Sequence, residues 1–179
     1  MLAFYSRPGL GDSTRHEGRS VASAAGDVAA LADQLGHDRF FTAGWSGGGP
    51  HALACAALLP DRVRAAATIA GVAPFDAEGL DWTAGMGEDN QVEYPLAARD
   101  PGELLRFMAP SVQAYATIEP DQIVTQMRSL MSEVDAAQIT GAFGENLAAS
   151  FRSAIRHGPW GWFDDDLAFV RDWASTWRT

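Results

Sequence analysis

The feature that most constrains the fold is a segment in which an apolar run, a glycine-rich turn and an alanine-rich stretch follow one another. Residues 40–43 are apolar and favour a strand, residues 44–48 (Gly-Trp-Ser-Gly-Gly) favour a sharp turn, and residues 52–59 favour a helix. A strand, a turn and a helix in this order are the repeating unit of α/β folds. The segment therefore predicts an α/β protein with Ser46 at the bend.

The spacing of the glycines around Ser46 suits a nucleophile. A hydroxyl group can attack a substrate only if it projects free of the strand, and Gly44 and Gly48 would keep side chains out of the tight crossing that such a turn requires. The N–H group of Gly47, at the start of the helix, could stabilise an oxyanion. The alternative interpretation is a glycine-rich turn that only connects a strand to a helix.

Composition and charge exclude several classes of function. The chain has 179 residues, which suits one domain, and its formal net charge of −10 argues against nucleic acid or an anionic membrane as partner. It has no run of roughly 20 apolar residues that could span a membrane. Cys55 is the only cysteine, so an internal disulfide is excluded and a reducing compartment is favoured. Because residues 1–6 are too short for a signal peptide, we expect a cytoplasmic protein.

The rest of the first 75 residues completes an α/β pattern. Residues 2–5 and 65–70 favour buried strands. Residues 20–36 carry apolar side chains at helical spacing, with Ser20 as the expected N-cap and Gly36 as the expected stop. Alternating strands and helices predict a parallel sheet. We expect residues 1–75 to form a partial α/β core that contains the turn at Ser46.

The region from residue 76 to residue 163 changes to helical segments, which we interpret as a lid inserted after the core. Asp100 is the expected N-cap of one helix, with Pro101 at its first position and Glu103 completing a capping box. Further helices are expected from Pro120, around residues 139–143 and over residues 145–157. Residues 164–166, three consecutive aspartates, are expected to cap a C-terminal helix within residues 164–179, rather than to bind a metal.

Three segments resemble the α/β-hydrolase superfamily, in its serine esterase or lipase-like branch. Residues 7–13 are similar to that family's loop after its fourth strand, residues 27–31 to its next helix, and residues 44–50 to its nucleophile elbow. The resemblance spans the whole chain. It implies that Ser46 is the nucleophile, that Gly47 supplies an oxyanion N–H group, and that Gly44, Trp45 and Gly48 shape the elbow. It further implies hydrolysis of a small carboxylic ester or related acyl substrate, without cofactor or metal; a proline iminopeptidase-like activity stays open.

The departures from the family lead to a second hypothesis. In the family, three strands and an oxyanion loop precede the position where this chain starts, and strands that carry the acid and the histidine follow the lid, so we expect a truncated hydrolase. Asp76 is the candidate acid, and the alternative, which its position favours, is that it caps a loop or a helix. Of the histidines after Ser46, we expect His51 to pack in the interior and His157 to lie at a helix end. The alternative function is therefore an inactive remnant that acts by binding or association.

The resemblance also leads to a structural expectation for the sheet. The family places a further strand between the two that correspond to residues 2–5 and 40–43. We expect these two to pair directly here, in a parallel sheet of three strands. One apolar edge of this sheet would stay uncovered and would be open to self-association.

Overall fold

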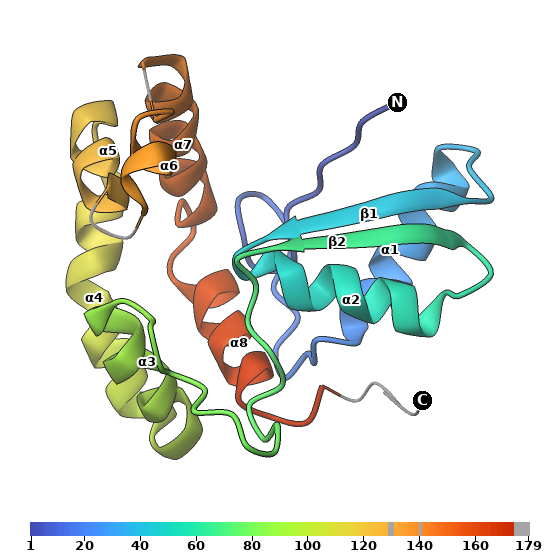
Figure 1. The fold of residues 1–179 in the computed structure, drawn as a ribbon, viewed down its shortest axis with the longest axis horizontal. Helices are drawn as coiled ribbons and strands as arrows, with labels where there is room; N and C mark the ends of the chain where they lie inside the picture. The colour runs from blue at the N-terminus through green and yellow to red at the C-terminus, as the bar shows by residue number, and fades with distance from the viewer. Residues whose placement is uncertain (129–130, 140, 174–179) are drawn as a thin grey trace. The chain divides into compact units, whose positions relative to one another are not determined.

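The computed structural model describes residues 1–128, 131–139 and 141–173. The chain divides into two compact units (Figure 1). The first unit comprises residues 1–16 and 85–163, and the second comprises residues 17–84 together with the segment that begins at Asp164. The functional division into a core over 1–75, a lid over 76–163 and a C-terminal segment stays a prediction.

The second unit contains the sheet. Strands β1 (Phe40–Trp45) and β2 (Val63–Ile69) pair in parallel, and helix α2 (Gly48–Leu58) connects them. Helix α2 packs against both strands, and helix α1 (Ser23–Gln34) packs against α2 (Figure 1). The expected strand–turn–helix–strand order is thus present, in a small parallel sheet with flanking helices.

Helix α1 begins later than the sequence predicted. Its N-cap position is Ala22, and Ser20 does not cap it; instead the backbone N–H of Ser20 donates to the hydroxyl of Ser23 (3.1 Å). The predicted stop at Gly36 is confirmed. Gly36 has φ +72°, a left-handed backbone conformation that is unstrained for glycine and strained for residues with a Cβ atom.

The prediction that residues 2–5 form a strand beside β1 is wrong. Within the described parts of the chain, the sheet has two strands, β1 and β2, and residues 2–5 lie outside it. The loop that follows is attached to helices of its own unit, because Gly11 N–H donates to the Ala154 carbonyl (3.2 Å) and Gly161 N–H donates to the Gly9 carbonyl (3.1 Å). Since Gly9 also has φ +81°, the chain turns there and continues away from an extended path.

The first unit is helical. Its elements are α3 (Glu88–Arg99), α4 (Pro101–Ala116), α5 (Pro120–Arg128), α6 (Glu133–Ala136), α7 (Gly141–Ala154) and the first turn of α8 (Trp160–Phe169). A core cluster forms where α5 meets α7, from Ile118, Ile123, Leu147 and Ala148. The start of α4 follows the prediction, since the carboxylate of Asp100 accepts from the Glu103 N–H (2.9 Å) and Pro101 is the first helical residue.

Three helix predictions need correction. No helix was predicted over α3, whose interior contains Pro95. The helix predicted around residues 139–143 is instead the start of α7, which runs from Gly141, while Thr140 lies outside the described residues. The three aspartates do not cap a later helix: α8 begins four residues before them, at Trp160, ends at Phe169, and buries them. Residues 174–179 of the predicted helix also lie outside the described residues.

No helix among the described residues is both long and apolar enough to cross a membrane.

Candidate active site

Ser46 lies between β1 and α2 in a strained backbone conformation. Its φ is +50°, and among the described residues only one other non-glycine residue, Ala70, has a positive φ. The turn is fixed on both sides, because Ser46 N–H donates to the Ile69 carbonyl (2.8 Å) and Gly49 N–H donates to the Ser46 carbonyl (2.9 Å). The side chain of Ser46 is exposed. A strained turn that presents a serine to solvent is the geometry that a nucleophile elbow requires.

The glycines of the turn are required by close backbone contacts. A Cβ atom at Gly44 would lie 2.7 Å from the Gly49 nitrogen and closer still to the Gly48 carbonyl. A Cβ atom at Gly49 would lie 2.9 Å from the Cα of Gly71 and against the hydroxyl of Thr68. Any side chain at these positions would push α2 away from the strands. The glycines therefore allow α2 to start directly above the ends of β1 and β2.

Gly47 occupies the N-cap position of α2, with φ −56° and ψ −11°. The first N–H groups of a helix have no acceptor within the helix, and the helix dipole adds partial positive charge there. No side-chain hydrogen bond caps this end of α2. The backbone beside Ser46 can therefore donate to an anionic oxygen.

Asp76 lies in an exposed turn after β2. The loop around it is closed by the Trp82 indole N–H, which donates to the Ala73 carbonyl (2.7 Å), and by the edge-on contact of Phe75 with Trp82. This places Asp76 on the same unit as Ser46 and leaves its carboxylate accessible. Its role as the acid is a prediction that these contacts do not decide.

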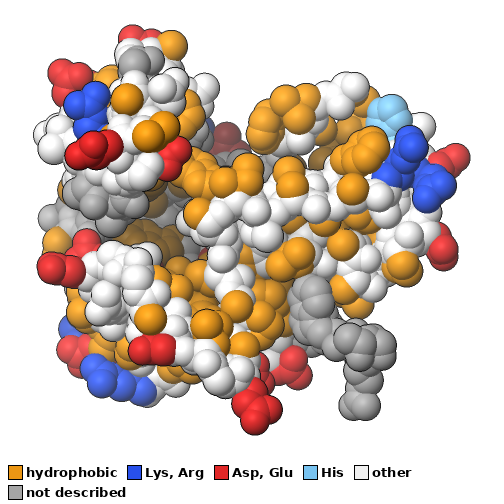
Figure 2. Space-filling view, viewed as in Figure 1, with side chains coloured by type: hydrophobic (Ala, Val, Ile, Leu, Met, Phe, Trp, Pro, Cys, Tyr) orange, Lys and Arg blue, Asp and Glu red, His pale blue; other side chains and the backbone are white. Residues whose placement is uncertain are grey.

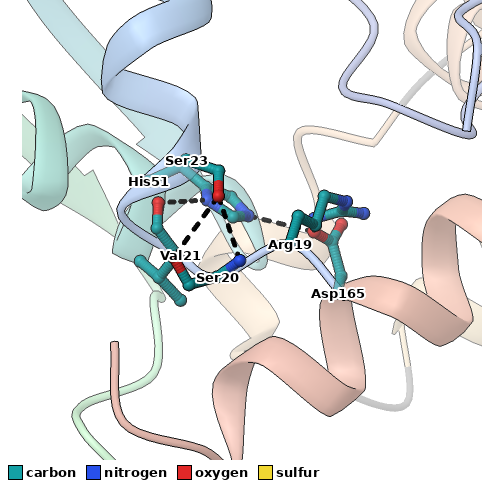
Figure 3. Close-up of polar contacts among 6 residues, drawn as sticks. All are labelled: Arg19, Ser20, Val21, Ser23, His51 and Asp165. Carbon is teal, nitrogen blue, oxygen red and sulfur yellow. Dashed lines mark hydrogen bonds and ion pairs between the residues drawn. The ribbon is translucent and has the colours of Figure 1, made fainter. Parts of the chain in front are cut away.

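His51 is buried in the second unit and both its nitrogens have acceptors (Figure 3). Nδ1 is 3.3 Å from the Val21 carbonyl, and Nε2 is 3.0 Å from Oδ1 of Asp165, which also pairs with Arg19. The ring packs against Phe169, with centroids 5.7 Å apart. His51 thus links α2 to α8 in the interior, as expected of a packing histidine, and does not serve Ser46 as a base.

His157 belongs to the first unit and is also engaged. Its Nε2 is 3.2 Å from Oδ1 of Asp12, and Arg156 reaches the same carboxylate (3.1 Å). All three side chains are more than half exposed. Within the described residues, no histidine is hydrogen-bonded to Ser46, and no three His, Cys, Asp or Glu side chains gather as a metal site would require.

The network of Arg19, His51 and Asp165 is the feature that sequence reasoning missed. The three side chains come from segments far apart in the chain, and each is at most 5% exposed. A signal was present: three aspartates within an otherwise apolar and aromatic helix must be paired if that helix is buried. The arrangement as a whole provides an exposed hydroxyl group, backbone N–H groups at the uncapped start of α2, and a buried polar network that joins α2 to α8.

One comparison with known proteins identifies a family for this chain. A family model described as alpha/beta hydrolase fold matches residues 3–157. Among solved structures, the chain is similar to an alpha/beta hydrolase fold protein from Nakamurella multipartita, with 29% sequence identity and a TM-score of 0.46. That match covers 92% of this chain and 56% of the other, so this chain spans little more than half of that protein's length. No match was found among curated proteins.

Proposed function

Because the chain belongs to the alpha/beta hydrolase fold family, we propose that it is a serine hydrolase whose nucleophile is Ser46. The observation that carries the proposal is the strained, exposed Ser46 at the junction of β1 and α2. A positive φ at a serine costs on the order of 1 kcal/mol or more, and it persists where the surrounding contacts enforce it. Such strain at a presented hydroxyl is characteristic of a catalytic serine.

The reaction follows from the groups beside Ser46. Its Oγ attacks the carbonyl carbon of an ester, the hydroxyl proton leaves to a base, and the carbonyl oxygen becomes an oxyanion. The N–H group of Gly47 donates to that oxyanion. The C–O bond to the alcohol then breaks, the alcohol leaves with a proton, and water cleaves the acyl-enzyme to release the acid and restore Ser46. No cofactor or metal takes part in these steps.

The substrate class we propose is a small carboxylic ester. Ser46 is exposed, so a small acyl group can reach it without the rearrangement of a buried site. Activity on the amide bond of an N-terminal proline, as in proline iminopeptidases, uses the same steps with an amine as the leaving group. Measurement of p-nitrophenyl acetate and p-nitrophenyl butyrate hydrolysis beside that of a prolyl-coumarin amide separates the two.

Asp76 is the proposed acid of the site. It follows β2, so it lies on the same unit as Ser46, and its carboxylate is exposed. If it supports the base, Asp76→Asn lowers kcat for ester hydrolysis at least tenfold with KM little changed. Glu78→Gln, a change of the same kind two residues away in the same exposed loop, serves as control and leaves kcat unchanged.

A second function, a non-catalytic binding module, is favoured by one observation. Both histidines that follow Ser46 are engaged in contacts with aspartates, His51 with Asp165 and His157 with Asp12. A serine without a base keeps an ordinary hydroxyl group and reacts poorly. Ester hydrolysis that exceeds the buffer rate and disappears in Ser46→Ala supports the serine hydrolase. Hydrolysis that is equal in both proteins supports the binding module.

A further inference from the structure

The backbone N–H groups that can stabilise an oxyanion beside Ser46 lie in the first turn of α2. Within this turn, Gly49 N–H donates to the Ser46 carbonyl (2.9 Å), and Pro50 has no N–H group. The N–H groups of Gly47 and Gly48 are therefore the donors that this turn offers to an anionic oxygen. Their direction depends on how the first turn of α2 is held.

His51 lies one helical turn after Gly47. Residues four positions apart lie on the same face of a helix, one above the other. This spacing applies here because Gly47 already has helical dihedral angles, with φ −56° and ψ −11°. Any rotation or tilt of α2 that moves His51 therefore also moves the N–H group of Gly47.

The side chain of His51 is attached to two segments outside α2 (Figure 3). Its Nδ1 is 3.3 Å from the Val21 carbonyl, just before α1, and its Nε2 is 3.0 Å from Oδ1 of Asp165 in α8. The ring also packs against Phe169 of α8. All of these residues belong to the second unit, as Ser46 does. The start of α2 is thus connected through one side chain to the segment before α1 and to α8.

Asp165 gives His51 a fixed point of attachment. Charged side chains normally lie at the surface, where Figure 2 shows those of the viewed face. Arg19 and Asp165 are instead each 4% exposed, and they pair with each other. A buried carboxylate that left its partners would lose the contacts that replace water. Asp165 is therefore held in place, and His51 through it.

Contacts on the other side of α2 do not fix its rotation. Gly49 lies two residues before His51, and hence on roughly the opposite side of the helix. It lies close to Gly71, since a Cβ atom at Gly49 would be 2.9 Å from the Gly71 Cα. A glycine has no side chain that could resist rotation of the helix on this surface. The rotation of α2 about its axis is therefore set on the side of His51.

We propose that His51 is a positioning residue of the active site. Its contacts with Val21 and Asp165 fix α2 in the orientation in which the Gly47 N–H donates to the oxyanion formed at Ser46. This inference rests on the proposed function, and His51 itself touches no reacting atom. Misplacement of a reacting or stabilising group by 1 Å can lower a rate by on the order of 100-fold. Because the oxyanion forms only in the reaction, loss of these contacts lowers kcat and leaves KM little changed.

Steady-state hydrolysis of p-nitrophenyl butyrate by His51→Phe tests the proposal. Phenylalanine keeps an aromatic ring beside Phe169 and removes both polar contacts, so kcat should fall about tenfold or more, with KM changed less than about twofold. His51→Gln has an amide nitrogen that can donate to the Asp165 carboxylate, and it should recover most of the loss. Cys55→Ala is the matched control, because Cys55 is buried one turn further along the same face of α2, and it should leave kcat unchanged.

Amide hydrogen exchange measured by NMR tests the same positioning without catalysis. In His51→Phe, the Gly49 amide, whose hydrogen bond to Ser46 closes the turn, should exchange about tenfold faster than in wild-type protein. The Phe40 amide, which donates to the Arg62 carbonyl (2.9 Å) at the other end of β1, should change by less than about twofold. A difference between the two amides separates a local loss of position from a general loss of stability.

Four outcomes overturn the proposal: equal kcat in wild-type protein and His51→Phe, a loss that Cys55→Ala shares, a loss that His51→Gln does not reduce, or unchanged exchange at Gly49. Circular dichroism verifies that each variant is folded. If His51→Phe is unfolded, His51→Asn replaces it, since asparagine has no group in place of Nε2. Wild-type protein without esterase activity, together with faster exchange at Gly49 in the variant, would refute Ser46 as the nucleophile and support the positioning by His51.

Discussion

At the scale of single residues, the backbone conformation of Ser46 has a cost in stability. Its φ of +50° is unfavourable for any residue with a Cβ atom, and the hydrogen bonds of its backbone to Ile69 and Gly49 hold it there. Glycine would adopt the same conformation without strain, but it has no hydroxyl group. A serine at this position is consistent with a role that only its side chain can perform.

The strain at Ser46 predicts that two substitutions differ in their effect on the free energy of unfolding. Ser46→Ala keeps the Cβ atom and therefore the strain, whereas Ser46→Gly removes it. We expect Ser46→Gly to be more stable than Ser46→Ala by about 1 kcal/mol in the free energy of unfolding, as measured by urea denaturation. Equal stability of the two variants would show that the turn stores no strain.

The close contact at Gly44 predicts a loss of stability. In Gly44→Ala the new methyl group meets the backbone of Gly48 and Gly49, so α2 has to move, at a cost of about 1–3 kcal/mol. Gly26→Ala is the matched control, because Gly26 lies in α1 with open space around it, and there alanine should stabilise the helix by up to about 1 kcal/mol. If both substitutions have the same sign, the crossing at Gly44 is looser than the structure indicates.

Part of the site was predictable at this scale. The turn at Ser46 could be predicted from the spacing of Gly44, Ser46 and Gly48, because the backbone conformation of a tight turn depends on residues that are neighbours in the sequence. The partner of His51 was not predictable, because Asp165 follows it by 114 positions and only the packing of α8 brings the two together. Long-range pairs of this kind leave no pattern in a single sequence.

At the scale of helices and strands, the network of Arg19, His51 and Asp165 joins α2 to α8. All three side chains are nearly inaccessible to water, so their contacts with one another take the place of contacts with water. Asp165→Ala should cost about 3–5 kcal/mol in the free energy of unfolding, because it removes a buried carboxylate that both Arg19 and His51 contact.

A surface pair provides the comparison for this prediction. Asp12→Ala removes an equivalent contact with Arg156 and His157, but there every partner is mostly exposed, so the cost should stay below about 1 kcal/mol. Denaturation in urea measures both variants. Equal effects of Asp165→Ala and Asp12→Ala would contradict the buried network.

Burial of α2 predicts a pH effect through Cys55. Desolvation raises the pKa of the Cys55 thiol from its ordinary value to about 11, so the folded protein keeps the thiol neutral while the unfolded chain ionises it above about pH 9. This contribution to stability is complete below pH 9 and is lost as the pH rises toward 11. Between pH 8.5 and 10, wild-type protein should therefore lose roughly 0.5–1 kcal/mol more than Cys55→Ala does. Parallel losses in both proteins would exclude the thiol as a cause.

Helix boundaries were predictable where local chemistry sets them and not where packing does. Asp100, Pro101 and Glu103 start α4 through contacts within one turn, and the sequence predicts them. In contrast, α3 contains Pro95 and α8 contains three aspartates, and both patterns argue against a helix interior. For the aspartates, burial in the packed helix and the pairing of Asp165 with Arg19 and His51 override the local preference. The failed strand at residues 2–5 has the same origin, since pairing depends on partners distant in sequence.

At the scale of the whole molecule, the family match and the position of Ser46 agree with each other. The match of residues 3–157 to the alpha/beta hydrolase fold establishes the family, and the strand–turn–helix at Ser46 lies inside that match.

The central claim is that Ser46 is a nucleophile, and covalent labelling with a fluorophosphonate tests it most directly. Intact-mass spectrometry of the folded protein should show one phosphonyl group per chain, and peptide mapping should place that group on Ser46. Ser46→Ala, with the same fold by circular dichroism, should show none. Folded wild-type protein that stays unlabelled after prolonged incubation, or that is labelled equally in Ser46→Ala, would contradict the account.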